Sequence, residues 1–288
     1  MTAGEALLAK ARANFHARLL ETVLTVSSDG VPSNADKDSA ASVKIAKKLA
    51  EGLGKMSVRA RGAGQTSGKD FEDACVAFLE ETFTKMGHLR PGQWCMRVLG
   101  QRESNALAQF EQYSHLLRLA EAVKKEPQLA SIIGSDYFIV PDIVVARLPE
   151  LDSAINSNQG IVNSECATKT PLRASNSEQA LIHASVSCKW TLRSDRAQNA
   201  RSEALALIRN RKGRVPHIVA VTAEPLPARL ASLALGTSDL DCVYHFALYE
   251  LIAAVDRDEL PDAYEMLCTL VEGKRLRDIS DLPMDLCV

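Results

Sequence analysis

The stretch from residue 181 to residue 223 restricts the fold of this chain more than any other. Residues 181–190, LIHASVSCKW, alternate between apolar and polar side chains, which is the period of a β-strand. A helical stretch follows to about Asn210, and the run VPHIVAVTA at 215–223 predicts another strand. Strands that alternate with helices favour an α/β fold, with a central mixed β-sheet flanked by helices.

Helices dominate the first half of the sequence. We expect them at about 4–25, 39–54, 67–86 and 105–125. The third begins with Ser67 as its N-cap, and its apolar side chains recur at helical spacing, at Phe71, Cys75, Phe78, Leu79 and Phe83.

The second half introduces strands. The run DYFIVPDIVVARL at 136–148 predicts a strand that bends at Pro141 and continues as a central strand. Residues 150–178 are polar and irregular, which predicts a surface excursion, whereas 241–255 fits either a strand or a helix. Because no Pro/Ser-rich linker or internal repeat divides the chain, we expect residues 1–288 to form a single domain with a helical N-terminal part.

Composition excludes several classes of protein. Hydrophobic residues make up 46% and charged residues 24%, and 34 Lys and Arg against 36 Asp and Glu leave a net charge of −2. A polycation is excluded, so nucleic-acid binding would need a local basic patch. No apolar run reaches the ~20 residues of a membrane span. The seven scattered cysteines form no CxxC pair, as expected of reduced thiols in the cytoplasm.

Three residues on consecutive elements form a candidate hydrolytic site. Asp142 follows Pro141 at the head of an apolar strand, Lys189 ends the polar face of the strand at 181–190, and Glu203 lies in the next helix. Two carboxylates can hold Mg²⁺, which lowers the pKa of a bound water, and a lysine can orient or deprotonate that water. A Pro-Asp turn beside a solvated lysine is the alternative, and the spacing alone does not decide.

The segment after Lys189 carries groups that contact DNA bases. Arginine donates two hydrogen bonds to guanine and aspartate accepts one from cytosine, and both types lie together at Arg193, Asp195 and Arg196. From residue 189 to residue 214 there are eight Lys and Arg against two Asp and Glu. A solvated basic helix would show the same charge, but a metal site beside it favours a nucleic-acid ligand.

Longer motifs in this region resemble a known family. The run SCKWTLRSDRAQNARSE at 187–203 is similar to the active-site and recognition region of the NgoMIV-type restriction endonucleases, a type II family of the PD-(D/E)xK superfamily. The similarity continues through RNRKGRVPHIVAVTAEP, ALGTSDLDCVYHFALYEL and GKRLRDISDLP, and upstream through SNAD, GQTSG, GSDY and PDI. It covers most of residues 30–288 and is weak over 1–30, 40–60 and 150–178.

The resemblance implies a restriction-endonuclease-like core with a rearranged catalytic motif. The residues it assigns to catalysis or metal binding are Asp142, Ser187, Cys188, Lys189, Glu203 and Glu72. Ser187 occupies the position of the usual superfamily acid, two residues before the lysine, and Glu203 supplies the acid instead. Asp142, Glu203 and the backbone carbonyl of Cys188 would hold Mg²⁺, Lys189 would act at the water, and Glu72 would be an accessory acid.

The resemblance also implies DNA contacts and an assembly. Arg193, Asp195 and Arg196 would contact the central CCGG, and the flanking G·C pairs would be contacted by Asp36, Gln65 and Arg229. Family members of this type cut GCCGGC after the first G. They assemble as homotetramers of two back-to-back dimers that bind two duplexes.

The predicted function is that of a type II restriction endonuclease in a restriction-modification system, with Mg²⁺-dependent hydrolysis of double-stranded DNA that leaves 5′-phosphate and 3′-hydroxyl ends. Two alternatives remain. One is another metal-dependent DNA nuclease on the same core, for repair or junction resolution, which would need no dense base-contacting segment. The other is a non-catalytic DNA-binding protein, against which the presence of all four candidate catalytic side chains argues: Glu72, Asp142, Lys189 and Glu203.

Overall fold

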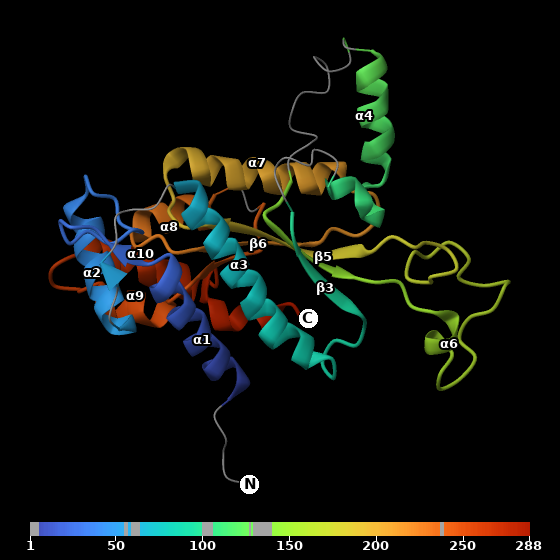
Figure 1. The fold of residues 1–288 in the computed structure, drawn as a ribbon, viewed down its shortest axis with the longest axis horizontal. Coiled ribbons are helices and arrows are strands. Elements are labelled where there is room, and N and C mark those ends of the chain that lie inside the picture. Colours follow the sequence, from blue (N-terminus) through green and yellow to red (C-terminus); the bar gives the residue numbers. More distant parts are fainter. Residues whose placement is uncertain are drawn as a thin grey trace, which may run out of the picture.

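A six-stranded sheet lies at the centre of the protein (Figure 1). The computed structural model describes residues 6–54, 57–58, 64–99, 106–126, 128, 140–236 and 239–288. In sheet order the strands are β3 (Trp94–Val98), β4 (Ile143–Arg147), β5 (Leu181–Lys189), β6 (His217–Thr222), β7 (Cys242–His245) and β8 (Leu276–Asp278). A mixed sheet with helices around it confirms the predicted fold class.

The sheet is antiparallel at one end and parallel at the other. β3, β4 and β5 pair antiparallel, whereas β5, β6, β7 and β8 pair parallel. A parallel neighbour requires a crossover connection, which helix α7 (Ser194–Asn210) provides between β5 and β6. The antiparallel pairing places the start of β4 beside the end of β5, and this geometry locates the candidate site.

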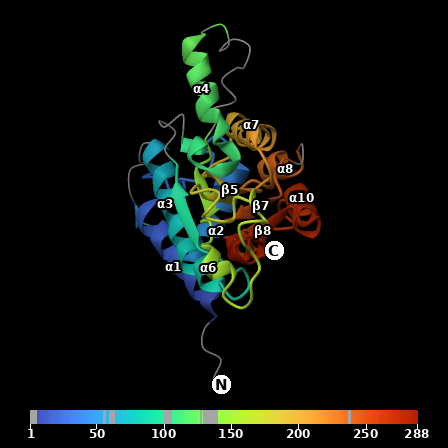
Figure 2. The same ribbon diagram turned by 90° about the vertical axis from the view of Figure 1, so that its right-hand side faces the viewer.

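Helices cover both faces of the sheet. Figure 2 shows α1 (Leu7–Thr22) and α3 (Gly64–Thr82) on one side, with α7, α8 (Pro227–Ala234) and α10 (Pro261–Glu272) on the other. The predicted apolar stripe of α3 is fully buried. Because helices cover both faces, β5 is buried on its polar face as well, where Ser185 and Ser187 are only 1% and 3% exposed.

Two expectations about the first half are wrong. Helix α3 begins at Gly64, so Ser67 is not its N-cap, and a 3₁₀ turn (Phe83–Met86) follows it. The expected long helix at 105–125 is instead two 3₁₀ turns, η2 (Ala106–Gln109) and η3 (Glu111–Tyr113), followed by α4 (His115–Lys125). Helix α4 projects away from the sheet at the top of Figures 1 and 2.

Contacts with the sheet explain the broken helix. The Glu111 N–H donates to the Ala180 carbonyl at 3.0 Å. The Gln112 amide donates to the Ile182 carbonyl at 2.7 Å and accepts from its N–H at 2.9 Å. The buried Tyr113 hydroxyl donates to the Leu207 carbonyl at 3.0 Å. The Glu111 N–H is thereby taken from the backbone ladder of a continuous helix, and the side-chain bonds of Gln112 and Tyr113 hold the segment against β5 and α7. Tertiary contacts therefore outweigh local propensity here.

The second half follows its pattern more closely. The expected central strand is β4, whereas residues 136–139 and the GSDY motif at 134–137 lie outside the described residues. The ambiguous segment 241–255 contains both elements, since β7 is followed by α9 (Leu248–Ala254), which packs on α2 (Ala40–Leu53). A separate pair, β1 (Thr25–Val26) and β2 (Ser57–Val58), forms a small parallel sheet.

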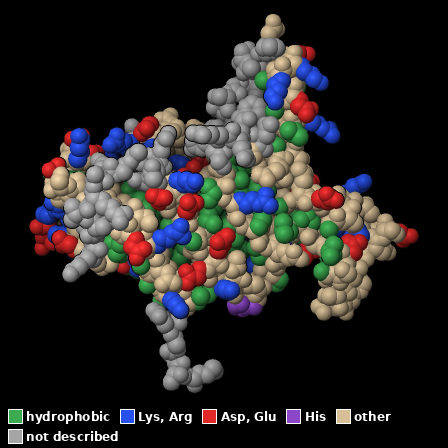
Figure 3. Space-filling model, in the orientation of Figure 1, with side chains coloured by type: hydrophobic (Ala, Val, Ile, Leu, Met, Phe, Trp, Pro, Cys, Tyr) green, Lys and Arg blue, Asp and Glu red, His purple; other side chains and the backbone are tan. Residues whose placement is uncertain are grey.

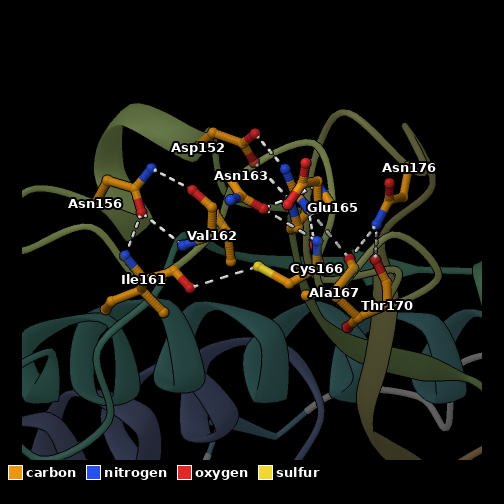
Figure 4. Close-up of polar contacts among 11 residues, drawn as sticks. Asp152, Asn156, Ile161, Val162, Asn163, Glu165, Cys166, Ala167, Thr170 and Asn176 are labelled. Atoms are coloured by element: carbon orange, nitrogen blue, oxygen red, sulfur yellow. Dashed lines mark hydrogen bonds and ion pairs between the residues drawn. The ribbon is translucent and has the colours of Figure 1, made fainter.

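Residues 150–178 form the predicted surface excursion, with one short helix, α6 (Asp152–Ile155). Polar contacts hold it together, and Figure 4 shows most of them. The buried Arg173 guanidinium binds the Asp152 carboxylate at 2.6 and 2.9 Å and the Cys166 carbonyl at 2.6 Å. Asn156 accepts two backbone N–H bonds, from residues 161 and 162. Side-chain hydrogen bonds therefore shape this segment in place of regular backbone ladders.

The surface carries charges of both signs. On the face drawn in Figure 3, Lys and Arg side chains are interspersed with Asp and Glu, in keeping with the nearly neutral net charge. None of the helices within the described residues is long and apolar enough to span a membrane.

Candidate active site

Asp142 and Lys189 meet where β4 begins and β5 ends. Lys189 Nζ lies 2.7 Å from Asp142 Oδ2, and the same oxygen accepts the backbone N–H of Cys188 at 2.7 Å. Asp142 is 4% exposed. Antiparallel pairing of Ile143 with Val186 sets this register, so residues far apart in the sequence become neighbours.

Glu203 approaches from α7 and is also buried. Its Oε2 lies 3.9 Å from Lys189 Nζ and accepts a hydrogen bond from the Ser187 hydroxyl at 3.4 Å. Ser187 and Lys189 thus project from β5 toward the same carboxylate, as the strand alternation predicts. The Cys188 side chain is buried, as expected for the apolar face.

Glu72 on α3 completes the set of acids. Burial raises the pKa of Glu72 to about 7, with a further contribution from the negative charge of Asp142, while Lys189 opposes the shift. Burial also raises the pKa of Glu203, although Lys189 partly offsets it. Burial would lower the pKa of Lys189, but Glu203 and Asp142 outweigh it and raise that pKa. Three acids therefore interact electrostatically with Lys189 at this site.

The donors at this site suit a hard divalent cation. Among the described residues, no three His, Cys, Asp or Glu side chains are arranged to hold a metal by themselves. Two carboxylates, Asp142 and Glu203, lie close to Lys189 Nζ, and the backbone carbonyl oxygen of Cys188 lies nearby. Because the N–H and C=O of a strand residue face the same neighbouring strand, the Cys188 carbonyl faces the Asp142 side, where its N–H binds. Carboxylate and carbonyl oxygens are the ligands that Mg²⁺ prefers, with water filling the remaining positions.

The candidate base-contacting residues after β5 gather at the start of α7. Arg193 is the N-cap residue and is exposed, Asp195 lies exposed in the first helical turn, and Arg196 donates to the Thr191 hydroxyl at 2.9 Å. An acid in the first turn also stabilises a helix through its dipole, so Asp195 has a structural use as well. The start of α7 therefore presents two arginines and an aspartate one short loop away from Lys189.

Asp36 and Arg229 form an ion pair although 193 positions separate them. The hydrogen bond from Arg229 lowers the pKa of Asp36, and the positive charge of Arg193 adds to this shift. The structure therefore brings Arg193 within electrostatic reach of that pair. Gln65 lies in the first turn of α3, but its side chain is outside the described residues.

Two further polar residues, which no sequence pattern predicted, lie next to these side chains. Glu224 follows β6 and is completely buried, and Asn34 is completely buried beside it, with its amide donating to the Ala223 carbonyl at 2.9 Å. An acid–proline pair, Glu224-Pro225, directly after the apolar strand could have drawn attention to Glu224, because Pro141-Asp142 precedes a strand in a similar way.

Known proteins match this chain over almost its whole length. A family model described as NgoMIV restriction enzyme matches residues 15–288. The type II restriction enzyme NgoMIV of Neisseria gonorrhoeae is 50% identical over 283 residues, which are 98% of this chain and 99% of that enzyme. These matches define a type II restriction endonuclease, a site-specific deoxyribonuclease. The chain belongs to the NgoMIV restriction enzyme family.

Membership in this family decides between the predicted functions. A restriction enzyme binds DNA and hydrolyses it, which excludes the non-catalytic alternative and disfavours a repair or junction-resolving nuclease. It also implies that the reaction depends on a divalent metal ion.

Proposed function

We propose that this endonuclease recognises a palindrome with a central CCGG, GCCGGC in full, and cuts after the first G to leave 5′-phosphate and 3′-hydroxyl ends. One observation carries the proposal. The end of β5 holds the Asp142–Lys189–Glu203 cluster, and the loop after it leads directly to Arg193, Asp195 and Arg196. A site that hydrolyses phosphodiesters and side chains that fit guanine and cytosine are thus joined by a few residues.

Each residue of the cluster has a chemical role in this proposal. Asp142, Glu203 and the Cys188 carbonyl would hold Mg²⁺, which supplies a water of lowered pKa and stabilises charge on the scissile phosphate. Lys189, held at 2.7 Å from Asp142, orients the attacking water and offsets the growing negative charge. Glu72, with its pKa of about 7, can take up a proton near neutral pH as an accessory acid. Ser187 orients Glu203 through its hydroxyl.

The base contacts follow from hydrogen-bond geometry. Arg193 and Arg196 can each donate two bonds to guanine O6 and N7, and Asp195 can accept from cytosine N4. Asp36, Gln65 and Arg229 would contact the flanking G·C pairs, and the Asp36–Arg229 pair supplies an acceptor and a donor side by side.

Assembly, location and domain organisation complete the proposal. The family resemblance supports a homotetramer, two back-to-back dimers that bind two duplexes. A cytoplasmic location would give the enzyme access to invading DNA. We also propose a single domain for residues 1–288, because buried apolar side chains from both halves belong to one cluster.

Digestion of plasmid DNA tests the proposed function. With Mg²⁺ we expect a fixed set of fragments, and sequencing of their ends should give a 5′-phosphate on CCGGC. No cleavage is expected without a divalent metal. Ends that begin at a different sequence would refute the proposed site, and random ends would refute recognition by the start of α7.

A further inference from the structure

The three chain segments that carry Arg193, Arg229 and Asp36 converge on residues 223 and 224, directly after β6. Glu224 Oε2 accepts the N–H of Leu192, the residue before Arg193, at 2.7 Å. Glu224 Oε1 accepts the N–H of Leu226, the N-cap residue of α8, at 3.2 Å. The side chain of Asn34, two residues before Asp36, binds the Ala223 carbonyl at 2.9 Å.

Glu224 is also a counter-charge for Arg229. Its Oε2 lies 3.7 Å from Arg229 Nη1, and Nη2 of the same guanidinium binds Asp36. Arg229 therefore lies between two carboxylates, of which Glu224 is completely buried and Asp36 is partly exposed. In the proposed DNA complex Asp36 would turn toward a base, and Glu224 would remain behind Arg229 as its buried anionic partner.

An ionised carboxylate is the side chain that suits these contacts. It accepts on both oxygens and donates nothing, so it can bind two loop N–H groups and an arginine together. Glutamine in the same place would turn an NH₂ group toward one of these donors, and alanine would leave both buried N–H groups without this acceptor.

The position of Glu224 also ties these loops to the proposed catalytic strand. β6 pairs parallel with β5, and Thr222 is the register partner of Lys189. The Thr222 hydroxyl accepts the N–H of Glu224 at 3.2 Å, which fixes the turn that carries the buried acid. One short turn therefore locates Arg193 and Arg229 relative to Lys189.

We propose that Glu224 is a positioning residue for recognition of the outer base pairs, which sets Arg229 and the Leu192–Arg193 turn before DNA arrives. The inference rests on the proposed function, because it assigns Arg229 and Asp36 to DNA contacts. A structural role alone would make Glu224 matter for folding and for every DNA sequence alike. A positioning role predicts instead that replacing Glu224 weakens binding of the recognition site more than binding of other sequences.

Binding of two duplexes separates these roles. One duplex carries the site mapped from the ends of wild-type products, and the other differs only in its outer base pair. Dissociation constants are measured with Ca²⁺ in place of Mg²⁺, for wild type, Glu224→Gln and Glu224→Ala. We expect Glu224→Gln to weaken binding of the mapped site by about fivefold or more, the loss typical of one impaired base contact. Binding of the altered duplex should stay within about twofold, and Glu224→Ala should lose more.

Asp241→Asn is the matched control. Asp241 accepts the N–H of Ile218 at 2.8 Å at the opposite end of β6, so it is another carboxylate bound to this strand but remote from the loops. We expect it to leave the ratio of the two dissociation constants unchanged. Thermal unfolding of each variant reports folding. If Glu224→Gln does not fold, Thr222→Val, which removes the hydroxyl that accepts the Glu224 N–H, should change the ratio in the same direction.

Two results would overturn the inference: equal losses on both duplexes, or an unchanged ratio in a folded Glu224→Gln protein. Failure of the proposed function has a different signature, which is seen in wild type. If its product ends show no central CCGG or no preference at the outer pair, the proposed recognition site is wrong before any variant is compared.

Discussion

Replacement of Glu203 tests the proposed metal site most directly. We predict that Glu203→Ala loses cleavage while it still binds its site, because the carboxylate is a proposed metal ligand and the base contacts lie elsewhere. A divalent metal contributes several kcal/mol to stabilisation of the transition state. A loss of about 4 kcal/mol corresponds to a rate about 10³-fold lower, at roughly 1.4 kcal/mol per factor of ten.

The structure also predicts a rescue. The Ser187 hydroxyl oxygen lies 3.4 Å from Glu203 Oε2. A glutamate at position 187 carries its carboxylate oxygens about 2.5 Å beyond the place of that hydroxyl, which spans most of the gap. Glu203→Ala vacates the volume that the longer side chain needs, so the double change roughly conserves core volume. We expect the cleavage rate of Ser187→Glu/Glu203→Ala to be about tenfold or more above that of Glu203→Ala.

Single-turnover cleavage of a short duplex with Mg²⁺ measures the rate, and binding with Ca²⁺ measures recognition. Glu265→Ala, which removes an exposed acid on α10, is the control and should cut like wild type. Cleavage by folded Glu203→Ala at the wild-type rate would refute the assignment of this carboxylate. Loss of both site binding and cleavage in folded Glu203→Ala would show that Glu203 acts in recognition instead.

Three further predictions concern metal binding, recognition and stability. Asp142→Ala should abolish cleavage in digests yet leave site binding in gel shifts largely intact, and wild-type cleavage would remove Asp142 from the site. Arg193→Ala should lose about 1–3 kcal/mol of discrimination against an altered CCGG in competition binding. If Arg211, in the basic run at 189–214, contacts only phosphate, Arg211→Ala should instead weaken binding of all sequences alike and reduce the salt slope by about one. Equal losses on cognate and altered DNA for Arg193→Ala would refute its base contact. Burial lowers the pKa of His245 to about 4, so the unfolded state binds more protons and stability should fall by up to about 3 kcal/mol from about pH 6.5 to 4. Urea unfolding across this range should show a weaker pH dependence of the unfolding free energy for His245→Gln than for wild type. An equally steep dependence would contradict the lowered pKa of His245.

Local patterns in the sequence predicted much of the parallel half of the fold. The alternation at 181–190 became β5, the helical stretch became α7, and the run at 215–223 became β6, because periodicity reports the faces that a strand or helix buries. The apolar spacing of α3 located its buried face for the same reason. Motif resemblance supplied the candidate catalytic side chains and the family, and the comparisons confirmed the family.

Contacts between distant segments decided the rest. The expected continuous helix at 105–125 is interrupted by 3₁₀ turns, where Gln112 and Tyr113 bind β5 and α7. These partners are far away in the sequence, so local patterns do not reveal them. The pairing of Asp142 with Lys189 depends on the antiparallel register of β4 and β5, which spacing does not reveal. The strand pattern showed that β5 has two faces, and only the packing of helices on both sides buried them both.

The sequence by itself therefore determined the types of side chain and the elements that carry them, since both depend on near neighbours along the chain. Only the tertiary structure decided which of those side chains meet. Arg229 pairs with Asp36 and also contacts Glu224, because separate segments pack together at the end of β6. Nothing local in the sequence links these residues. Long-range contacts of this kind depend on how whole surfaces pack, and that is a property of the folded chain as a unit.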